Sequence, residues 1–344
     1  MRVLVAMSGG VDSSVAAAMA LEAGHDVVGA TMKLWGGPSD SGCCSVADVE
    51  DARRVAQQLG VAHHVFNFTA DFDRHVVDPY IAGHDGGATP NPCVECNRHL
   101  KFDRFTERAH QLGFDKVATG HHARVGFADG LWRLQRAVDG AKDQSYVLHM
   151  LDQAALSRLL FPVGELTKAE VRSQAAELGL RTAAKPDSQD VCFISRTGGR
   201  EAFLGDRIAL RPGRLVDTSG AVVGQVPAVQ LVTVGQRRGL GSTPATKAQR
   251  RFALDVDLST NTVRVGTLDQ LMVSEIPVSS MTWIASCVSS GSPVLMQASA
   301  HGTPCSGVWA GDRVVLDVPA RRVAPGQSVV LYDGDRVLGG GIAC

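Results

Sequence analysis

Short apolar runs alternate with Ala-rich or amphipathic segments through the first half of the chain. The runs predict buried strands at residues 2–7, 25–32, 62–68 and 116–119. The segments between and after them predict helices at residues 15–21, 46–59, 98–112 and 146–151, most of which are followed closely by a glycine. This alternation is typical of α/β proteins with a doubly wound parallel sheet, in which ligands collect at the carboxyl ends of the strands.

The pattern changes at about Arg211. Short Val-rich runs separated by Gly, Pro and Asp predict strands at residues 214–216, 221–223, 230–234, 262–265, 313–316, 328–332 and 336–339. At 344 residues the chain is longer than one average core requires. We expect an α/β catalytic domain over residues 1–200, a small β-rich central domain over 201–270, and a C-terminal β-barrel domain over 271–344.

Composition and charge exclude several classes of protein. Apolar residues make up 44% of the chain and charged residues 20%, which leaves no room for extensive disorder. A net charge of −1 gives no global attraction for nucleic acid, although the basic cluster at Gln236–Leu240 and Lys247–Arg251 offers a local one. Without a signal peptide or an apolar run of ~20 residues, we expect a cytoplasmic protein with no membrane partner. In a reducing compartment the eight cysteines are not expected to form a disulfide framework.

The segment Met7–Ser14, with the sequence MSGGVDSS, lies between the first predicted strand and the first predicted helix. Its two glycines allow close approach of the backbone, and its serine hydroxyls lie beside the unpaired N–H groups of the helix, an arrangement that binds anions. Asp12 makes sense in such a phosphate site if it holds a Mg²⁺ ion that bridges phosphate oxygens. The GxxxxGK[ST] motif of kinase-type loops is absent from the sequence. The structural alternative is an ordinary Gly/Ser turn with a helix cap.

Cys93 and Cys96 form a CxxC pair in the stretch TPNPCVECN. With Asn97 as the predicted N-cap of the helix at 98–112, Cys96 would lie just outside a helix N-terminus, next to Arg98. Both features favour a thiolate, so we expect Cys96 to be a nucleophile with a lowered pKa. The pair alone also suits a redox couple, half of a zinc site or part of an iron–sulfur site. Cys192, in DSQDVCFI, is the candidate second thiol.

Three polar loops add further candidates. The TGHHA turn at Thr119–Ala123 can present Gly120 to a nucleotide and His121 to a substrate, and Met32 ends another predicted strand. The Lys142–Gln144 loop can contact a phosphate and a base edge, or be a solvated turn. The capping box at Thr167–Glu170 is interpreted as structural and receives no chemical role.

The MSGGVDSS segment resembles the pyrophosphate loop of the N-type ATP pyrophosphatases, which adenylate a carbonyl oxygen. Together with TPNPCVECN, ATGHHAR, KDQSY, DSQDVCFI and VGQRRGLG, in this order along nearly the whole chain, it resembles the tRNA-specific 2-thiouridylase family. The resemblance implies that the C2 oxygen of the wobble uridine attacks the α-phosphate of ATP. It also implies that sulfur from a Cys192 persulfide, supplied by a sulfur relay protein, then replaces the oxygen, with Cys96 as the partner nucleophile. A Cys96–Cys192 disulfide would be formed and later reduced.

The resemblance also implies contacts with both substrates. The implied ATP contacts, with Mg²⁺ on Asp12, are Ala6, Met7, Ser8, Gly9, Gly10, Val11, Asp12, Ser13, Met32 and Gly120. The implied contacts with a tRNA of the Lys, Glu or Gln type are Asn91, Pro92, Cys93, His121, Lys142, Asp143, Gln144 and Gln327.

The sequence departs from the family pattern at two places. Many members have Asp where this chain has Cys93, and the alternative is therefore a [4Fe–4S] cluster on Cys93, Cys96 and Cys192 that carries the sulfur. An Arg-rich segment that would contact tRNA is expected before Pro304, but residues 298–302 read ASAHG. No role is assigned to Cys43, Cys44, Cys287, Cys305 or Cys344. The rival functions are an ATP-dependent amidoligase, which leaves the paired thiols unexplained, and a redox or metal sensor, which leaves the pyrophosphate loop unexplained.

Overall fold

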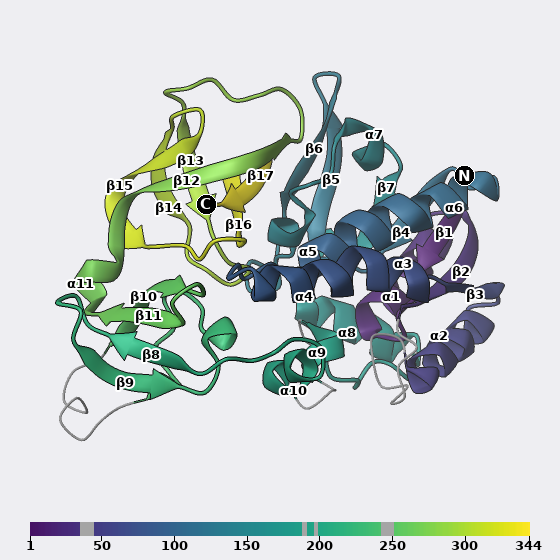
Figure 1. Ribbon diagram of the computed structural model, residues 1–344. Helices are drawn as coiled ribbons and strands as arrows, with labels where there is room; N and C mark the ends of the chain where they lie inside the picture. The colour runs from purple at the N-terminus through teal and green to yellow at the C-terminus, as the bar shows by residue number, and fades with distance from the viewer. Residues whose placement is uncertain (35–44, 188–190, 196–198, 242–250) are drawn as a thin grey trace.

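A five-stranded parallel sheet forms the core of the N-terminal half in the computed structural model, which describes residues 1–34, 45–187, 191–195, 199–241 and 251–344 (Figure 1). The strand order is β3-β2-β1-β4-β7. The strands are β1 (Arg2–Ala6), β2 (Asp26–Lys33), β3 (His63–Asn67), β4 (Lys116–Thr119) and β7 (Leu159–Leu160). The expected doubly wound parallel sheet is confirmed.

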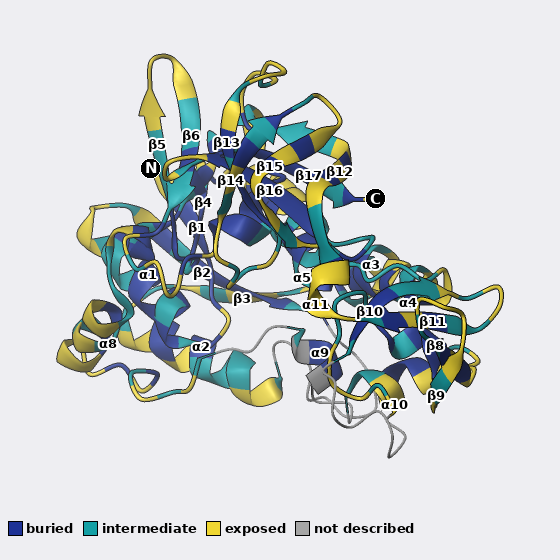
Figure 2. Cartoon of the chain, turned by 90° about the vertical axis from the view of Figure 1, so that its left-hand side faces the viewer, coloured by how far each residue is buried: buried dark blue, intermediate teal, exposed yellow. Residues whose placement is uncertain are grey.

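The central strand β1 is buried on both faces because its side chains alternate between two cores. Leu4 packs into one apolar cluster together with Phe72 and Phe105, whereas Val3 and Val5 pack into a second cluster with the helices on the opposite face. Figure 2 shows β1, β2 and β4 in dark blue, while the outward sides of α2 and α8 are yellow.

Helices cover both faces of the sheet. One face is covered by α1 (Val11–Glu22), α2 (Val46–Gln58) and α8 (Lys168–Glu177). The other is covered by two long helical segments that contain π-helical turns: α3 (Thr69–Phe72), η1 (Asp73–Val77) and α4 (Asp78–Asp85), then α5 (Pro92–Glu95), η2 (Cys96–Arg104) and α6 (Phe105–Gln111). The short helical elements that remain are η3 (Ser145–Leu148), α7 (Gln153–Leu156), η4 (Pro162–Glu165), α9 (Cys192–Ser195), α10 (Arg200–Gly205), η5 (Val229–Leu231) and α11 (Leu268–Leu271).

Two β-structures follow the α/β part. The first is a four-stranded sheet of order β10-β11-β8-β9, made of β8 (Gly213–Val216), β9 (Val222–Val226), β10 (Phe252–Asp257) and β11 (Thr262–Gly266). The second is a six-stranded barrel that closes through the pairing of β12 with β17. Its strands are β12 (Met272–Trp283), β13 (Pro293–Gln297), β14 (Cys305–Trp309), β15 (Arg313–Arg321), β16 (Ser328–Asp333) and β17 (Arg336–Ala343).

A hairpin of β5 (Ala123–Ala128) and β6 (Leu131–Arg136) connects the α/β part to the barrel. Gln135 of β6 pairs with Arg336 of β17, and one buried apolar cluster contains both Leu4 of β1 and Tyr332 of β16. The α/β part and the barrel therefore share a core. Figure 1 shows β5 and β6 between the two parts.

Several predicted elements are wrong in type or extent. The helix expected at 98–112 begins six residues earlier, at Pro92, because Asn91 caps it: its side chain accepts a hydrogen bond from the Cys93 N–H. Residues 145–148 form a 3₁₀ turn instead of a helix to 151, and 229–231 form a 3₁₀ turn where a strand was expected. Among the described residues, no helix is long and apolar enough to span a membrane.

Candidate nucleotide and thiol site

A cavity of about 240 Å³ opens at the carboxyl ends of β1, β2 and β4. Strand order reverses between β1 and β4, which is where ligands bind in open α/β sheets. The lining of the cavity includes residues from the loop after β1, from β2, from the segment at 92–101 and from the turn after β4. Of the ATP contacts that the family resemblance implied, those lining the cavity are Ala6, Met7, Ser8, Gly10, Val11, Asp12, Ser13, Met32 and Gly120.

The loop after β1 is shaped by its own backbone and hydroxyl groups. Gly9 has a φ of +72°, a conformation that favours glycine, and its ideal Cβ would lie 2.2 Å from the Asp48 carbonyl oxygen. The hydroxyl of Ser13 accepts from the Ser8 N–H at 3.2 Å, and α1 begins directly after Gly10. The N-terminus of α1 therefore points its unpaired N–H groups at the cavity, as a phosphate site requires.

Gly120 closes the other side of this loop. An ideal Cβ on Gly120 would lie 2.6 Å from the backbone nitrogen of Ser13 and 2.7 Å from the carbonyl carbon of Asp12. The turn after β4 therefore packs directly against the backbone of the loop, which only glycine permits.

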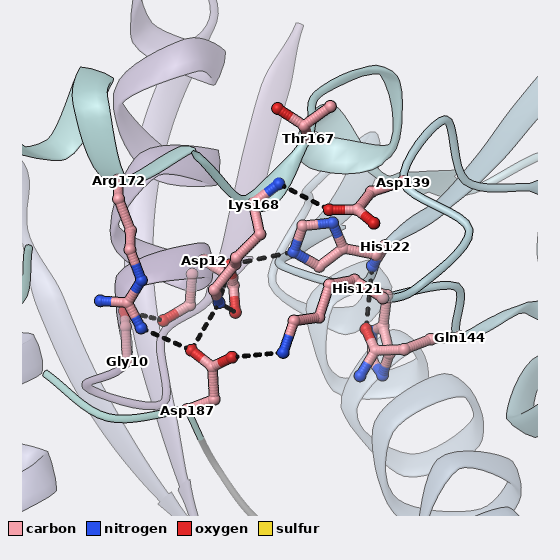
Figure 3. Close-up of polar contacts among 12 residues, drawn as sticks. Gly10, Asp12, His121, His122, Asp139, Gln144, Thr167, Lys168, Arg172 and Asp187 are labelled. Atoms are coloured by element: carbon pink, nitrogen blue, oxygen red, sulfur yellow. Dashed lines mark hydrogen bonds and ion pairs between the residues drawn. The ribbon is translucent and has the colours of Figure 1, made fainter. Parts of the chain in front are cut away.

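Asp12 is held by two side chains that sequence analysis did not assign to it. Its Oδ1 lies 3.0 Å from Nε2 of His122, and Nζ of Lys168 donates to both carboxylate oxygens at 2.7 Å (Figure 3). Burial by itself raises the pKa of Asp12, but the hydrogen bonds from His122 and Lys168 outweigh it, so the pKa lies below its ordinary value. Asp12 is therefore a carboxylate at neutral pH.

Two carboxylates, those of Asp12 and Asp187, line the cavity. Among the described residues, no group of three or more His, Cys, Asp or Glu side chains is arranged to hold a metal ion. Mg²⁺ commonly uses one or two protein carboxylates together with substrate phosphates and water, and Asp12 would supply such a carboxylate.

Asp187 lies at the centre of a second group of charges beside the loop. Its Oδ1 accepts from Arg172 at 2.7 Å and lies 2.9 Å from Lys168 Nζ, and its Oδ2 accepts from Lys142 at 2.7 Å. Burial raises the pKa of Asp187, but the hydrogen bonds from Lys142 and Lys168 lower it far more. Nearby, Lys185 Nζ donates to the Gly9 carbonyl at 2.9 Å, which holds the segment that contains Lys185 and Asp187 against the loop after β1.

The two thiols of the CxxC pair, Cys93 and Cys96, form part of the cavity wall. Since the helix begins at Pro92, Cys93 is in its first turn and Cys96 lies inside the helical segment, so the expectation that Cys96 lies just outside a helix N-terminus is wrong. The Val191 N–H donates to Cys93 Sγ at 3.4 Å, which brings the segment before Cys192 to the same wall. Cys192 begins α9, and its side chain lies outside the described residues.

His121 and Gln144, among the residues assigned to tRNA, also line the cavity. His121 is buried, which lowers its pKa well below the ordinary value, and its Nε2 lies 3.2 Å from Asn97 Oδ1. The Gln144 side chain accepts from the His122 N–H at 2.9 Å. Pro92 lines the cavity, whereas Asn91 caps the helix.

The other residues assigned to tRNA lie in three settings. Lys142 is exposed at the edge of the site, with 42% of its side chain accessible. Asp143 is buried and bonded internally, to Arg136 at 2.8 Å and to the Ser145 hydroxyl at 2.9 Å. Gln327 donates to the Thr89 carbonyl, close to the CxxC segment.

The remaining candidates lie elsewhere. Cys287 and Cys344 are exposed and Cys305 is half-buried, all on or beside the barrel. Cys43, Cys44 and most of the Lys247–Arg251 part of the basic cluster lie outside the described residues. In the ASAHG stretch, the backbone carbonyls of Ser299 and Ala300 accept from Gln297 Nε2.

Sequence analysis missed His122, Lys168, Asp187 and Lys185. Lys168 was hidden inside the capping box of α8, which is present as predicted but also places this lysine over the loop (Figure 3). A lysine at the first position of a helix is an ordinary surface residue in sequence, so only the position of Asp12 reveals its role.

Comparison with known proteins is decisive for the family. Three family models match the chain in order: the tRNA methyl transferase HUP domain over residues 1–196, the tRNA methyl transferase PRC-barrel domain over 201–267 and the aminomethyltransferase beta-barrel domain over 275–343. The tRNA-specific 2-thiouridylase MnmA of Mycolicibacterium smegmatis is 47% identical over 354 residues, which cover 98% of each chain. The chain belongs to the tRNA-specific 2-thiouridylase family.

A second member of this 2-thiouridylase family also matches over nearly the whole chain. The tRNA-specific 2-thiouridylase MnmA of Symbiobacterium thermophilum is 45% identical over 99% of this chain and 91% of its own. Among solved structures, a 4-thiouridine synthetase in complex with RNA and ATP aligns with 60% of this chain and 46% of its own, at 19% identity and a TM-score of 0.38. The thiouridylase assignment rests on the sequence matches alone.

Proposed function

We propose that the chain is an ATP-dependent tRNA-uridine 2-sulfurtransferase, which replaces the C2 oxygen of the wobble uridine U34 with sulfur and releases AMP and pyrophosphate. The observation that carries the proposal is one cavity lined both by the loop at the N-terminus of α1 and by the thiols Cys93 and Cys96. A nucleotide and a sulfur-carrying group would therefore act on the same bound base. An amidoligase needs no such pair of thiols, and a redox sensor needs no phosphate site.

Adenylation is the first step. The C2 oxygen of U34 attacks the α-phosphorus of ATP, the bond to the β-phosphate oxygen breaks, and pyrophosphate leaves. The N–H groups at the start of α1 would stabilise the phosphate charge, because they are fixed in place before the reaction. A Mg²⁺ ion bound with ATP would offset further negative charge and would be held by Asp12.

Sulfur transfer is the second step. The terminal sulfur of a Cys192 persulfide attacks C2, and AMP leaves with the original oxygen. Cys96 thiolate then attacks the Cys192 sulfur, which releases 2-thiouridine and leaves a Cys96–Cys192 disulfide. A two-electron reductant restores both thiols, and a relay protein that donates persulfide sulfur reloads Cys192.

The proposal extends to substrate, partners and location. Asn91, Pro92, Cys93, His121, Lys142, Asp143, Gln144 and Gln327 are the proposed contacts with tRNA of the Lys, Glu or Gln type. We also place the reaction in the cytoplasm, as the sequence analysis expects. The alternative route has a [4Fe–4S] cluster on Cys93, Cys96 and Cys192 as the carrier of sulfur.

The test combines spectroscopy with single-site variants. Anaerobically purified protein is analysed for iron and acid-labile sulfide, then assayed for 2-thiouridine in tRNA with a persulfide donor. We expect an iron-free, active protein, whereas iron-dependent activity would favour the cluster.

Asp12→Ala should abolish adenylation, and Cys192→Ser should stop thiolation while tRNA-dependent pyrophosphate release continues. Cys287→Ser, on an exposed thiol, is the control. Normal thiolation by Cys192→Ser would refute the persulfide route.

A further inference from the structure

Asp187 stands between an exposed lysine and the nucleotide loop. Its Oδ2 accepts from Lys142 Nζ at 2.7 Å, and its Oδ1 lies 2.9 Å from Lys168 Nζ. The same Nζ atom of Lys168 donates to both oxygens of Asp12 at 2.7 Å. Charged contacts therefore form a continuous path Lys142–Asp187–Lys168–Asp12 from the surface to the loop, and Figure 3 shows its inner part.

The two ends of this path differ in exposure. The Lys142 side chain is 42% exposed, whereas that of Lys168 is 12% exposed. An exposed lysine can exchange a carboxylate partner for a phosphate of a nucleic-acid backbone, because Lys and Arg side chains neutralise backbone phosphates in such complexes. Lys168 is less exposed than Lys142, so salt screens it less, and it responds strongly when fewer cations share the charge of Asp187.

Asp187 itself is anchored independently of Lys142. Arg172 donates to its Oδ1 at 2.7 Å and also donates to the carbonyls of Ala183 and Lys185, at 2.7 and 3.0 Å. The carboxylate therefore stays in place when Lys142 turns outward. What changes is the number of cations that share its charge.

We propose that Asp187 is a positioning residue that couples the binding of tRNA phosphate at Lys142 to the binding of nucleotide at Asp12, an inference that rests on the function proposed above. When Lys142 moves to a phosphate, Asp187 has one partner fewer and attracts Lys168 more strongly. Lys168 then shares less of its charge with Asp12, and that carboxylate becomes available to the nucleotide and its cation. Bound tRNA thus tightens nucleotide binding, and nucleotide tightens tRNA binding by the same factor.

The experiment measures this factor directly. Calorimetry gives the Kd of Mg²⁺–α,β-methylene-ATP, which cannot be cleaved between its α and β phosphates, with and without a saturating unmodified tRNA(Lys) transcript. For the unchanged protein we expect tRNA to lower Kd about five-fold or more. In Asp187→Asn and in Lys142→Gln the factor should fall towards one, and the double variant should lose no more than either single variant.

Asp333→Asn is the matched control, because it removes a carboxylate that forms a 3.0 Å ion pair with Arg336 on the barrel. In Asp333→Asn, tRNA should lower the nucleotide Kd by the same factor as in the unchanged protein. A folded Asp187→Asn variant that keeps the factor overturns the inference, as does an unchanged protein that thiolates tRNA without any coupling. If Asp187→Asn does not fold, Lys142→Gln decides by the same measurement. Failure of the unchanged protein to bind or thiolate tRNA would instead refute the proposed function.

Discussion

Gly120 is a residue at which one added methyl group would disturb the nucleotide loop. In Gly120→Ala the new carbon would lie 2.6 Å from a backbone nitrogen and 2.7 Å from a backbone carbon, neither of which can turn aside. We expect the free energy of unfolding to fall by about 1–3 kcal/mol. The displaced loop should also bind ATP more weakly. Urea denaturation and calorimetric titration with ATP measure the two effects.

Gly140 provides the comparison for this substitution. Its ideal Cβ would have no heavy atom within 4 Å, so Gly140→Ala should change stability by no more than about 0.5 kcal/mol. If Gly120→Ala behaves like Gly140→Ala in both measurements, the close packing of the β4 turn on the loop does not matter to the site.

Residue chemistry alone was enough to find the loop and the thiols. Gly9, Gly10 and Asp12 stand within a few positions of one another, and their meaning depends on a strand before them and a helix after them. Cys93 and Cys96 likewise stand close together in the sequence, as a CxxC pair. The partners of Asp12 could not be found this way, because His122 and Lys168 are 110 and 156 positions away.

At the scale of elements, the cap of α8 decides where Lys168 stands. The Thr167 hydroxyl accepts from the Glu170 N–H at 3.3 Å, and the Glu170 carboxylate accepts from the Thr167 N–H at 2.7 Å. Thr167→Ala should lower the free energy of unfolding by about 1 kcal/mol, because the helix start loses its cap. It should also raise the affinity for ATP, because Lys168, the first residue of the helix, would hold Asp12 less firmly. Urea denaturation and ATP titration test this.

Thr167→Ser is the control for the cap, because serine keeps the hydroxyl that bonds to Glu170. It should retain most of the stability and the nucleotide affinity. Equal losses in the two variants would show that the methyl group of Thr167, and not its hydroxyl, supports the helix start.

The helix at 92–111 shows why an element start was misplaced. Both Asn91 and Asn97 are suitable N-cap residues, and the sequence analysis chose Asn97. Asn91 is followed by Pro92, and proline is favoured at the first helical position, where its missing N–H costs nothing. Because the helix begins six residues earlier than expected, Cys96 lies inside it and not before it, although it still lines the cavity.

At the scale of the whole molecule, Arg136 joins the hairpin to the barrel. It pairs with the buried Asp143 at 2.8 Å, donates to Gln297 at 2.8 Å and lies 3.7 Å from the centre of the Tyr332 ring. Arg136→Met would leave the Asp143 carboxylate buried without its cation. We expect the free energy of unfolding to fall by about 3–5 kcal/mol, measured by urea denaturation.

Arg133 on the same strand serves as the control. Its partner Asp129 is 81% exposed, so Arg133→Met should change stability by no more than about 0.5 kcal/mol. Losses of similar size in both variants would mean that burial of the Arg136–Asp143 pair is unimportant for joining hairpin and barrel.

His149 makes stability depend on pH at this same junction. It is buried against Gly340 of the barrel, and neither ring nitrogen has a hydrogen-bond partner among the described residues. Burial, with a smaller contribution from the Arg98 charge, lowers its pKa from 6.5 to about 3. Below about pH 6.5 the His149 imidazole is therefore protonated in the unfolded chain but stays neutral in the folded protein. The free energy of unfolding consequently falls as the pH falls towards 3.

His149→Leu should remove this contribution. Between about pH 6 and pH 4, the variant should lose stability less steeply than the unchanged protein, by about 1.4 kcal/mol per pH unit. Denaturation at a series of pH values measures the slope. The exposed residue His110 gives the control His110→Leu, which should keep the original slope. If the free energy of unfolding of His149→Leu depends on pH as steeply as that of the unchanged protein, His149 is not the source of this pH dependence.

The sequence by itself determined the α/β alternation, the phosphate loop, the CxxC thiols and the change to β-structure, because each depends on the spacing of near neighbours. Tertiary structure alone decided that the hairpin at 123–136 joins the barrel, and that Lys142, Lys168 and Asp187 meet beside Asp12. The physical reason is that an ion pair forms wherever packing brings strand ends and helix starts together. Nothing local marks those side chains as partners until the sheet and its helices are assembled.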